Sequence, residues 1–113
     1  MSRQNKAARS LRIAVVAHVR HPIAEPFMGG MEAHCFHLVH GLQARGHDVT
    51  LFAAGDSAVD VPLIPVIPEH YDRAMPWADH HGTDRFNAFN DRAWEGVLPR
   101  LRDFDVIHNH GIW

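Results

Sequence analysis

Short apolar runs alternate with segments of helical periodicity along this chain. Residues 11–17 (LRIAVVA) and 48–54 (DVTLFAA) are rich in β-branched and aliphatic side chains, which is typical of strands buried on both faces of a parallel sheet. Residues 61–67 (VPLIPVI) predict a third strand, and its two prolines favour a sheet edge because proline cannot donate to the ladder. Residues 104–110 (FDVIHNH) predict a fourth strand.

Two helices are expected between these strands. The first has an apolar stripe at four positions spaced by three or four residues: Met31, Cys35, Leu38 and Leu42. Gly46 is suited to end this helix. The second has a stripe at five positions with the same spacing: Phe86, Phe89, Ala93, Val97 and Leu101. Asp84 suits its first turn, and Pro99 predicts a kink or an early end.

The order strand, helix, strand, strand, helix, strand predicts an α/β fold with a parallel sheet, since parallel strands need crossover connections. We expect the spatial order 3-2-1-4, which is half of a doubly wound sheet. Residues 1–10 are polar and basic, so we predict a disordered tail followed by a partial domain over residues 11–113. Residues 69–83 form a long polar loop, which is either a lid over a site or a poorly ordered excursion.

Composition narrows the class of protein. The chain has 113 residues, 46% of them apolar, and a formal net charge of −2, which is ordinary for one small soluble domain. We expect a cytoplasmic protein, because no run approaches the ~18 apolar residues of a membrane helix and the N-terminus lacks a secretory signal. The single Cys35 excludes an intramolecular disulfide, and the scattered Lys and Arg residues argue against a nucleic-acid partner.

Gly29 and Gly30 open the first predicted helix. With no Cβ at either position, backbone can approach a ligand closely. The start of the helix also presents unpaired N–H groups and the positive end of the helix dipole, which favour an anionic group such as a phosphate. The alternative is that the glycines only turn the chain and let the helix pack tightly on the sheet.

In a doubly wound sheet, ligands bind at the carboxyl ends of the strands where the strand order reverses, here strands 1 and 4. Strand 1 leads toward Gly29, and strand 4 ends at His108-Asn109-His110, so we predict that these distant stretches line one crevice. His108 and His110 share a face of the strand. His110, nearer the tip, is the better ligand contact, whereas His108 is expected to pack at the strand end. The absence of G-x-G-x-x-G after strand 1 argues against a dinucleotide-binding dehydrogenase.

The segments 11–17, 29–32, 42–56 and 104–110, in this order and spacing, resemble the N-terminal domain of family 4 retaining glycosyltransferases, which have the GT-B fold. The resemblance implies two Rossmann-like domains that face each other across a cleft. The N-terminal domain mainly holds the acceptor, and the C-terminal domain holds most of the nucleotide-sugar and carries a pair of glutamates. The resemblance also implies that no metal or other cofactor is needed, because backbone amides and basic side chains stabilise the leaving diphosphate.

Site residues follow from this resemblance. Gly29 and Gly30 are expected to approach the donor diphosphate, and His110 is the catalytic candidate. Three side chains around the crevice are expected to bind the acceptor or the transferred sugar: His18, Glu32 and His108. His18 is included because it leaves strand 1 at the crevice. Glu32 has an alternative role as an acid in the first helical turn, where it complements the dipole.

Three functions from different classes remain open. The first is the acceptor-side part of an enzyme that transfers sugar from a nucleotide-sugar to a sugar or small-molecule acceptor with retention; two such domains need about 300 residues, so the chain alone is expected to be inactive. The second is a binding or assembly module that associates through an exposed sheet edge. The third is a metal-binding protein that uses His34, His37 and His40, although each three-residue step turns by about 60°, which disfavours a shared ion.

Overall fold

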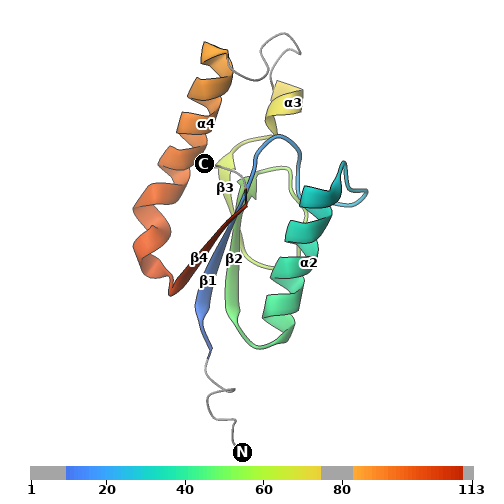
Figure 1. Cartoon of the computed structure of the whole chain (residues 1–113), viewed down its shortest axis with the longest axis vertical. Coiled ribbons are helices and arrows are strands. Elements are labelled where there is room, and N and C mark those ends of the chain that lie inside the picture. The colour runs from blue at the N-terminus through green and yellow to red at the C-terminus, as the bar shows by residue number, and fades with distance from the viewer. Residues whose placement is uncertain (1–9, 75–82, 111–113) are drawn as a thin grey trace, which may run out of the picture.

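The computed structural model describes residues 10–74 and 83–110. It contains four strands, in chain order: β1 (Arg12–Ala17), β2 (Asp48–Ala54), β3 (Leu63–Ile67) and β4 (Val106–His110). All pairings are parallel and the spatial order is β3-β2-β1-β4, which confirms the predicted half of a doubly wound sheet (Figure 1). Pro62 directly precedes β3 and Pro65 lies within it, and β3 is an edge strand, as expected. The predicted tail lies outside the described residues except for its last position.

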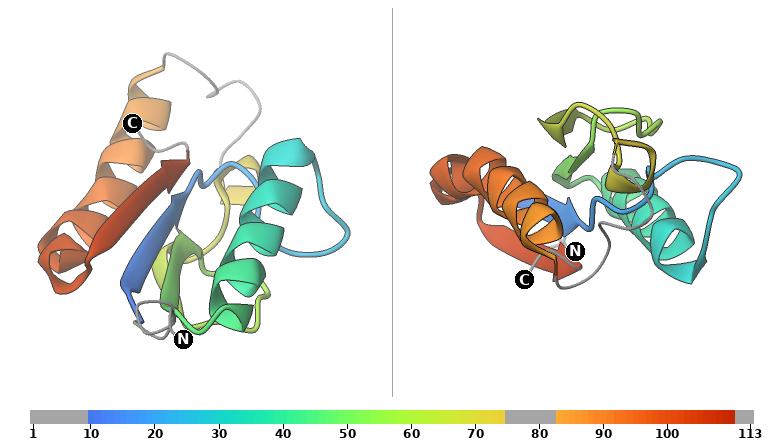
Figure 2. Two further views of the ribbon diagram at one scale, coloured as in Figure 1. Left: turned by 60° about the horizontal axis from the view of Figure 1, so that its bottom comes forward. Right: turned by 90° about the horizontal axis from the view of Figure 1, so that it is seen from above.

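Helices cover both faces of the sheet (Figure 2). α2 (Gly30–Ala44) packs on one face and α4 (Asp84–Val97) on the other. A short helix, α3 (Tyr71–Ala74), follows β3, so part of the predicted long loop is helical; its remainder lies outside the described residues. A 3-10 helix, η2 (Leu98–Asp103), follows α4. Within residues 10–74 and 83–110, no helix is long and apolar enough to cross a membrane.

β1 is the centre of the core. Ala14 and Val16 point toward α4, and Ile13 and Val15 point toward α2, as the two-residue period of a strand requires. All four side chains are at most 5% exposed. This confirms the prediction of a strand buried on both faces, and it fixes the end of β1 at Ala17, between the two helical layers.

β4 forms the other edge of the described sheet. It begins two residues later than predicted because Phe104 ends η2, where its N–H donates to the Leu101 carbonyl oxygen. Among the described residues β4 pairs only with β1, and Val106 and Ile107 are 40% and 45% exposed. The strand is therefore much more accessible than β1.

α2 ends in a turn that requires glycine. Gly46 has a φ of +92°, a backbone angle that residues with a Cβ rarely adopt. The N–H of Gly46 donates to the Gln43 carbonyl, and the N–H of His47 donates to the Leu42 carbonyl. These bonds satisfy the last carbonyls of the helix and return the chain to β2, as the sequence predicted.

The buried face of α2 is rotated from the predicted apolar stripe. Met31 is 46% exposed, whereas Glu32, Cys35 and Val39 are buried. The predicted stripe was wrong at Met31, its first position. Glu32 is buried there instead, because a carboxyl group that has a partner, here His18, can be buried near the end of the sheet. Burial, followed by the nearby Glu32, raises the pKa of the Cys35 thiol to about 11, so this thiol is unreactive in the folded protein.

α4 follows its predicted pattern closely. Thr83 caps the helix, since its hydroxyl oxygen accepts the N–H of Phe86 at 3.1 Å. Ala93 and Val97 are fully buried against the sheet. The α-helix ends at Val97 and Pro99 lies in the first turn of η2, so the expected early end is confirmed.

Gly55 allows a close approach of two backbone segments after β2. A Cβ there would lie 2.5 Å from the Pro68 carbonyl oxygen. We expect Gly55→Ala to lower the free energy of unfolding by about 1–3 kcal/mol, because backbone must move. Gly41→Ala, on the exposed side of α2 where a Cβ meets nothing within 4 Å, is expected to raise it by about 0.5–1 kcal/mol. Urea denaturation of both variants checks this, and similar midpoints would contradict the tight contact at Gly55.

Candidate active site

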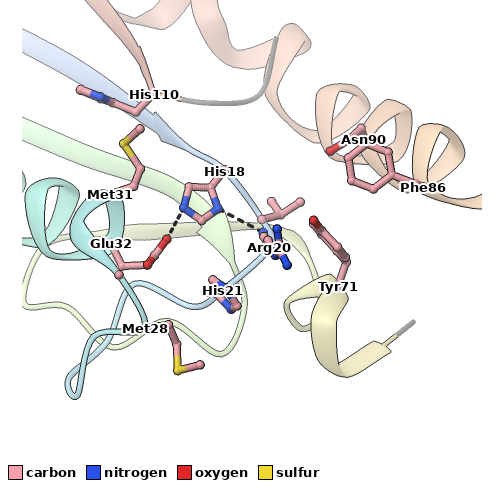
Figure 3. Close-up of a pocket in the computed structure, with 12 residues that line it drawn as sticks. His18, Arg20, His21, Met28, Met31, Glu32, Tyr71, Phe86, Asn90 and His110 are labelled. Atoms are coloured by element: carbon pink, nitrogen blue, oxygen red, sulfur yellow. Dashed lines mark hydrogen bonds and ion pairs between the residues drawn. The ribbon is translucent and has the colours of Figure 1, made fainter. Parts of the chain in front are cut away.

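A cavity of about 440 Å³ opens at the carboxyl ends of β1 and β4, beside the start of α2 (Figure 3). Gly29 and Glu32 line it from the start of α2, and His110 lines it from the end of β4. His18, which follows β1, is also part of the lining. His110 pairs in register with Ala17, the last residue of β1. The predicted convergence of these distant stretches on one crevice is therefore confirmed.

Glu32 and His18 form a pair at the floor of this cavity. Glu32 is only 3% exposed, and its Oε2 contacts Nε2 of His18. On the other side of the ring, His18 Nδ1 accepts the N–H of Arg20 at 3.2 Å. Because Nδ1 accepts, Nε2 holds the proton of the neutral ring and donates it to the Glu32 carboxyl. The pair fixes both the tautomer and the orientation of the imidazole.

Burial lowers the pKa of His18 below its usual 6.5, and the neighbouring Glu32 only partly opposes this effect. His18 is therefore neutral at pH 7. In the unfolded chain the ring takes up a proton more readily, so acidification favours unfolding. The contribution of His18 to stability is fully present above pH 6.5 and is lost as the pH falls from there through the folded-state pKa.

His110 presents a polar atom that no described residue satisfies. Its Nε2 is buried and has no hydrogen-bond partner among residues 10–74 and 83–110. Its ring centroid lies 4.2 Å from that of His108 and 5.0 Å from that of His34. Burial, with smaller effects of His108 and His34, lowers the pKa of His110. The imidazole is therefore neutral at pH 7, and the residue lines the cavity beside the end of β1.

His108 differs from the prediction. It was expected to pack at the strand end, but its side chain is exposed because β4 is an edge of the described sheet. The two strand-end histidines do share a face, since their rings are in contact. His108 is not among the described residues that line the cavity, so its role in substrate binding stays a prediction.

Gly29 and Gly30 are exposed and differ in what surrounds them. Gly29 has extended backbone, and a Cβ there would lie 3.0 Å from Oε1 of Glu32. A Cβ at Gly30 would meet nothing within 4 Å. The alternative that Gly30 serves close packing on the sheet is therefore wrong. Space above this residue is open to a ligand.

The sequence profile that describes Glycosyltransferase Family 4 matches residues 28–113. The chain belongs to this family. Two curated relatives, each a D-inositol 3-phosphate glycosyltransferase, come from Mycolicibacterium vanbaalenii and Mycolicibacterium smegmatis. Each is 29% identical over 111 aligned residues, which cover 88% of this chain and 24% and 25% of the respective relatives. The chain thus spans about a quarter of the length of these relatives.

The far wall of the cavity in this family 4 domain was not foreseen. It consists of Tyr71 from α3 with Phe86 and Asn90 from α4 (Figure 3). The rings of Tyr71 and Phe86 meet edge to face with centroids 5.3 Å apart. Sequence reasoning missed this wall because Tyr71 falls in the predicted polar loop and Phe86 in the predicted core stripe. The spacing of Phe86 and Asn90, one helical turn apart, was the available signal.

Two interactions hold α3 against the family 4 cavity. The N–H of Tyr71 donates to the Val19 carbonyl oxygen at 2.9 Å. Asp56, after β2, contacts His70 Nδ1 at 2.5 Å and accepts the His70 backbone N–H at 3.1 Å. Asp56 and His70 lie in two different loops, and their contacts join these loops and thereby position Tyr71.

The three helix histidines of the metal hypothesis contact Phe36 or His110 and are not gathered around one point. His40 Nδ1 donates to the Phe36 carbonyl oxygen at 2.7 Å, His37 contacts the Phe36 ring, and His34 contacts His110. In the part of the chain that the structure describes, no group of three or more His, Cys, Asp or Glu side chains is arranged to hold a metal ion. The hypothesis of a metal-binding protein gains no support from this arrangement.

Proposed function

We propose that this chain is the N-terminal, acceptor-side domain of an enzyme that transfers a hexose from a nucleotide-sugar to a sugar or small-molecule acceptor, with retention. The observation that carries the proposal is that Gly29 and His110, far apart in the sequence, line one cavity of a family 4 domain. In the reaction, an acceptor hydroxyl oxygen forms a bond to the anomeric carbon while the bond from that carbon to the diphosphate breaks. The proton of the hydroxyl is released with the nucleoside diphosphate.

We propose that different residues of the cavity bind the donor and the acceptor. The start of α2, at Gly29 and Gly30, favours the anionic diphosphate because backbone N–H groups and the helix dipole converge there. His110 is proposed to contact the reacting hydroxyl, because its side chain lines the cavity at the end of β4. His18 is held by Glu32 and also lines the cavity, where it would bind the acceptor or the transferred sugar. We propose that the transfer needs no cofactor.

The curated relatives are about four times as long as this chain. We propose that a second domain holds most of the donor, and that the 113-residue chain alone does not transfer sugar. The names of the relatives suggest D-inositol 3-phosphate as an acceptor for a first test. Arg20, which lines the cavity, would give an anionic acceptor group a favourable positive charge.

A transfer assay tests the proposal. The complete enzyme is incubated with UDP-glucose, UDP-N-acetylglucosamine or GDP-mannose, and with D-inositol 3-phosphate, myo-inositol or D-glucose as acceptor. Mass spectrometry is expected to detect a glycosylated acceptor, and NMR is expected to show the anomeric configuration of the donor retained. Inverted products, or no product with any pair, would contradict the proposal. The 113-residue chain is expected to give none.

Gly30→Val in the complete enzyme tests the proposed donor contact. Valine would occupy the open space above the backbone, where no protein atom lies within 4 Å of a Cβ. We expect the KM for the nucleotide-sugar to rise about tenfold, which corresponds to about 1.4 kcal/mol of binding, at an unchanged thermal midpoint. Gly41→Val, in an equally open position of the same helix, is the control and should leave this KM unchanged. Parallel losses of stability and activity in Gly30→Val would refute the contact.

The accessible edge of β4 favours a second candidate, an assembly module that pairs with another copy of the chain. Val106 and Ile107 are exposed there, and β4 has β1 as its sole strand neighbour among the described residues. A module of this kind would transfer no sugar in a chain of any length. The transfer assay therefore separates the two candidates.

A further inference from the structure

Asn90 is a mostly buried residue whose amide faces the cavity. It is 8% exposed, and its side chain forms no hydrogen bond with any residue in the described ranges. It lines the cavity on the α4 wall, across from Glu32 (Figure 3). An amide that the fold has largely withdrawn from water gains more from a hydrogen bond with a ligand than a fully exposed amide does. An unpaired amide that faces a cavity is therefore suited to contact a ligand.

The surroundings of Asn90 suit a ring with one apolar face. Phe86 lies one helical turn earlier on the same side of α4, and its ring also lines the cavity. Tyr71 contacts Phe86 edge to face and so restrains the orientation of that ring. The wall thus combines an aromatic surface with a neutral amide that is a hydrogen-bond donor and acceptor at once.

Hydroxyl groups match this amide better than a phosphate does. A hydroxyl both donates and accepts, as the amide does, whereas a phosphate at neutral pH offers mainly acceptor oxygens. The C–H face of a sugar or cyclitol ring is apolar and can lie on an aromatic side chain such as Phe86. The same wall can therefore hold one face of such a ring and one of its hydroxyls.

We propose that Asn90 is a specificity-determining residue that binds a ring hydroxyl of a polyhydroxylated acceptor, a sugar or a cyclitol, whose C–H face lies on Phe86. This inference rests on the proposed glycosyl transfer, since it names the acceptor class that the same cavity receives. Asn90 binds rather than reacts, because it lies on the wall opposite the His18–Glu32 pair.

Asn90→Leu in the complete enzyme tests the assignment. Leucine is similar in size and removes the unpaired amide, so we expect an unchanged or higher thermal midpoint. The KM for the better of the two acceptors myo-inositol and D-glucose is expected to rise about tenfold, whereas the KM for the nucleotide-sugar stays constant. Asn87→Leu, the same change at an exposed position of α4, is the matched control and should alter neither KM.

Binding is also measured without transfer, as the increase in thermal midpoint that each polyol produces. An increase in the thermal midpoint of the wild type that disappears in Asn90→Leu supports the inference. If polyols bind in this way but no sugar is transferred, only the proposed function fails. Equal increases in both proteins, no increase in the wild type, or an unchanged acceptor KM overturns it. A midpoint raised by inorganic phosphate but not by polyols overturns the hydroxyl assignment. A destabilised Asn90→Leu protein that loses activity in parallel marks Asn90 as structural and also overturns it.

Discussion

A complete enzyme that carries His110→Ala is expected to transfer sugar about 100-fold more slowly or worse, at an unchanged thermal midpoint. Nε2 of His110 is buried in the cavity wall without a partner among the described residues, so its removal breaks no hydrogen bond in that part of the fold. If the His110 ring holds the reacting hydroxyl, the rate must fall. The measurement is kcat/KM for the acceptor, together with thermal unfolding of the same preparation.

His37→Ala is the matched control for this prediction. His37 is an exposed histidine on α2, and its ring packs against Phe27 and Phe36 rather than lining the cavity. This variant should transfer sugar at the wild-type rate. A His110→Ala enzyme with similar activity to the control would remove the catalytic assignment. His108→Ala in the same series tests whether the exposed strand-end histidine also binds substrate.

Glu32→Ala is expected to lower kcat/KM by about 100-fold, because the His18 ring loses the carboxyl that holds it. Glu32→Gln keeps an oxygen that accepts the His18 N–H and should retain most of the activity. An exposed acid on α4 supplies the control, since Glu95→Ala changes charge equally without touching the cavity. Equal activity of the Ala and Gln variants would show that the hydrogen bond to His18 is not what matters.

The Gln variant also makes a prediction about pH. The charge of Glu32 raises the pKa of His18, although burial lowers it more. Removing that charge in Glu32→Gln leaves burial less opposed, so the pKa of His18 falls further. If neutral His18 is the active form, the acid-side loss of kcat/KM must move to lower pH in this variant, measured between about pH 4 and 8. A purely structural Glu32 would leave the pH profile in place.

The sheet was predictable because its signals are local. The side chains of β1 alternate between two buried faces, so an unbroken apolar run was sufficient to identify it. Gly46 marked the end of α2, and Pro99 marked the end of α4, through constraints on φ that act within a few residues. Parallel strands need crossover connections, and this rule predicted the strand order that the structure shows.

The site was predictable only in part. The position of Gly29 and His110 at one edge followed from the topology, because the carboxyl ends of neighbouring parallel strands meet there. The burial of Glu32 did not follow, since it depends on a partner fourteen positions earlier and on how far α2 is rotated about its axis. The packed role expected for His108 failed for a similar reason, because exposure at β4 depends on which strands lie beside it.

The sequence by itself determined the four strands, the two long helices, their order and the sheet edge at which the cavity opens, because backbone geometry sets these periods and constraints within short segments. Tertiary structure alone decided that His18 pairs with Glu32, that Tyr71 and Phe86 form the opposite wall, and that Asn90 has no hydrogen-bond partner among the described residues. Whether these side chains meet a partner depends on residues distant in the sequence. It is set by the rotation of each helix about its axis and by the position of the loops, which a local sequence pattern does not predict.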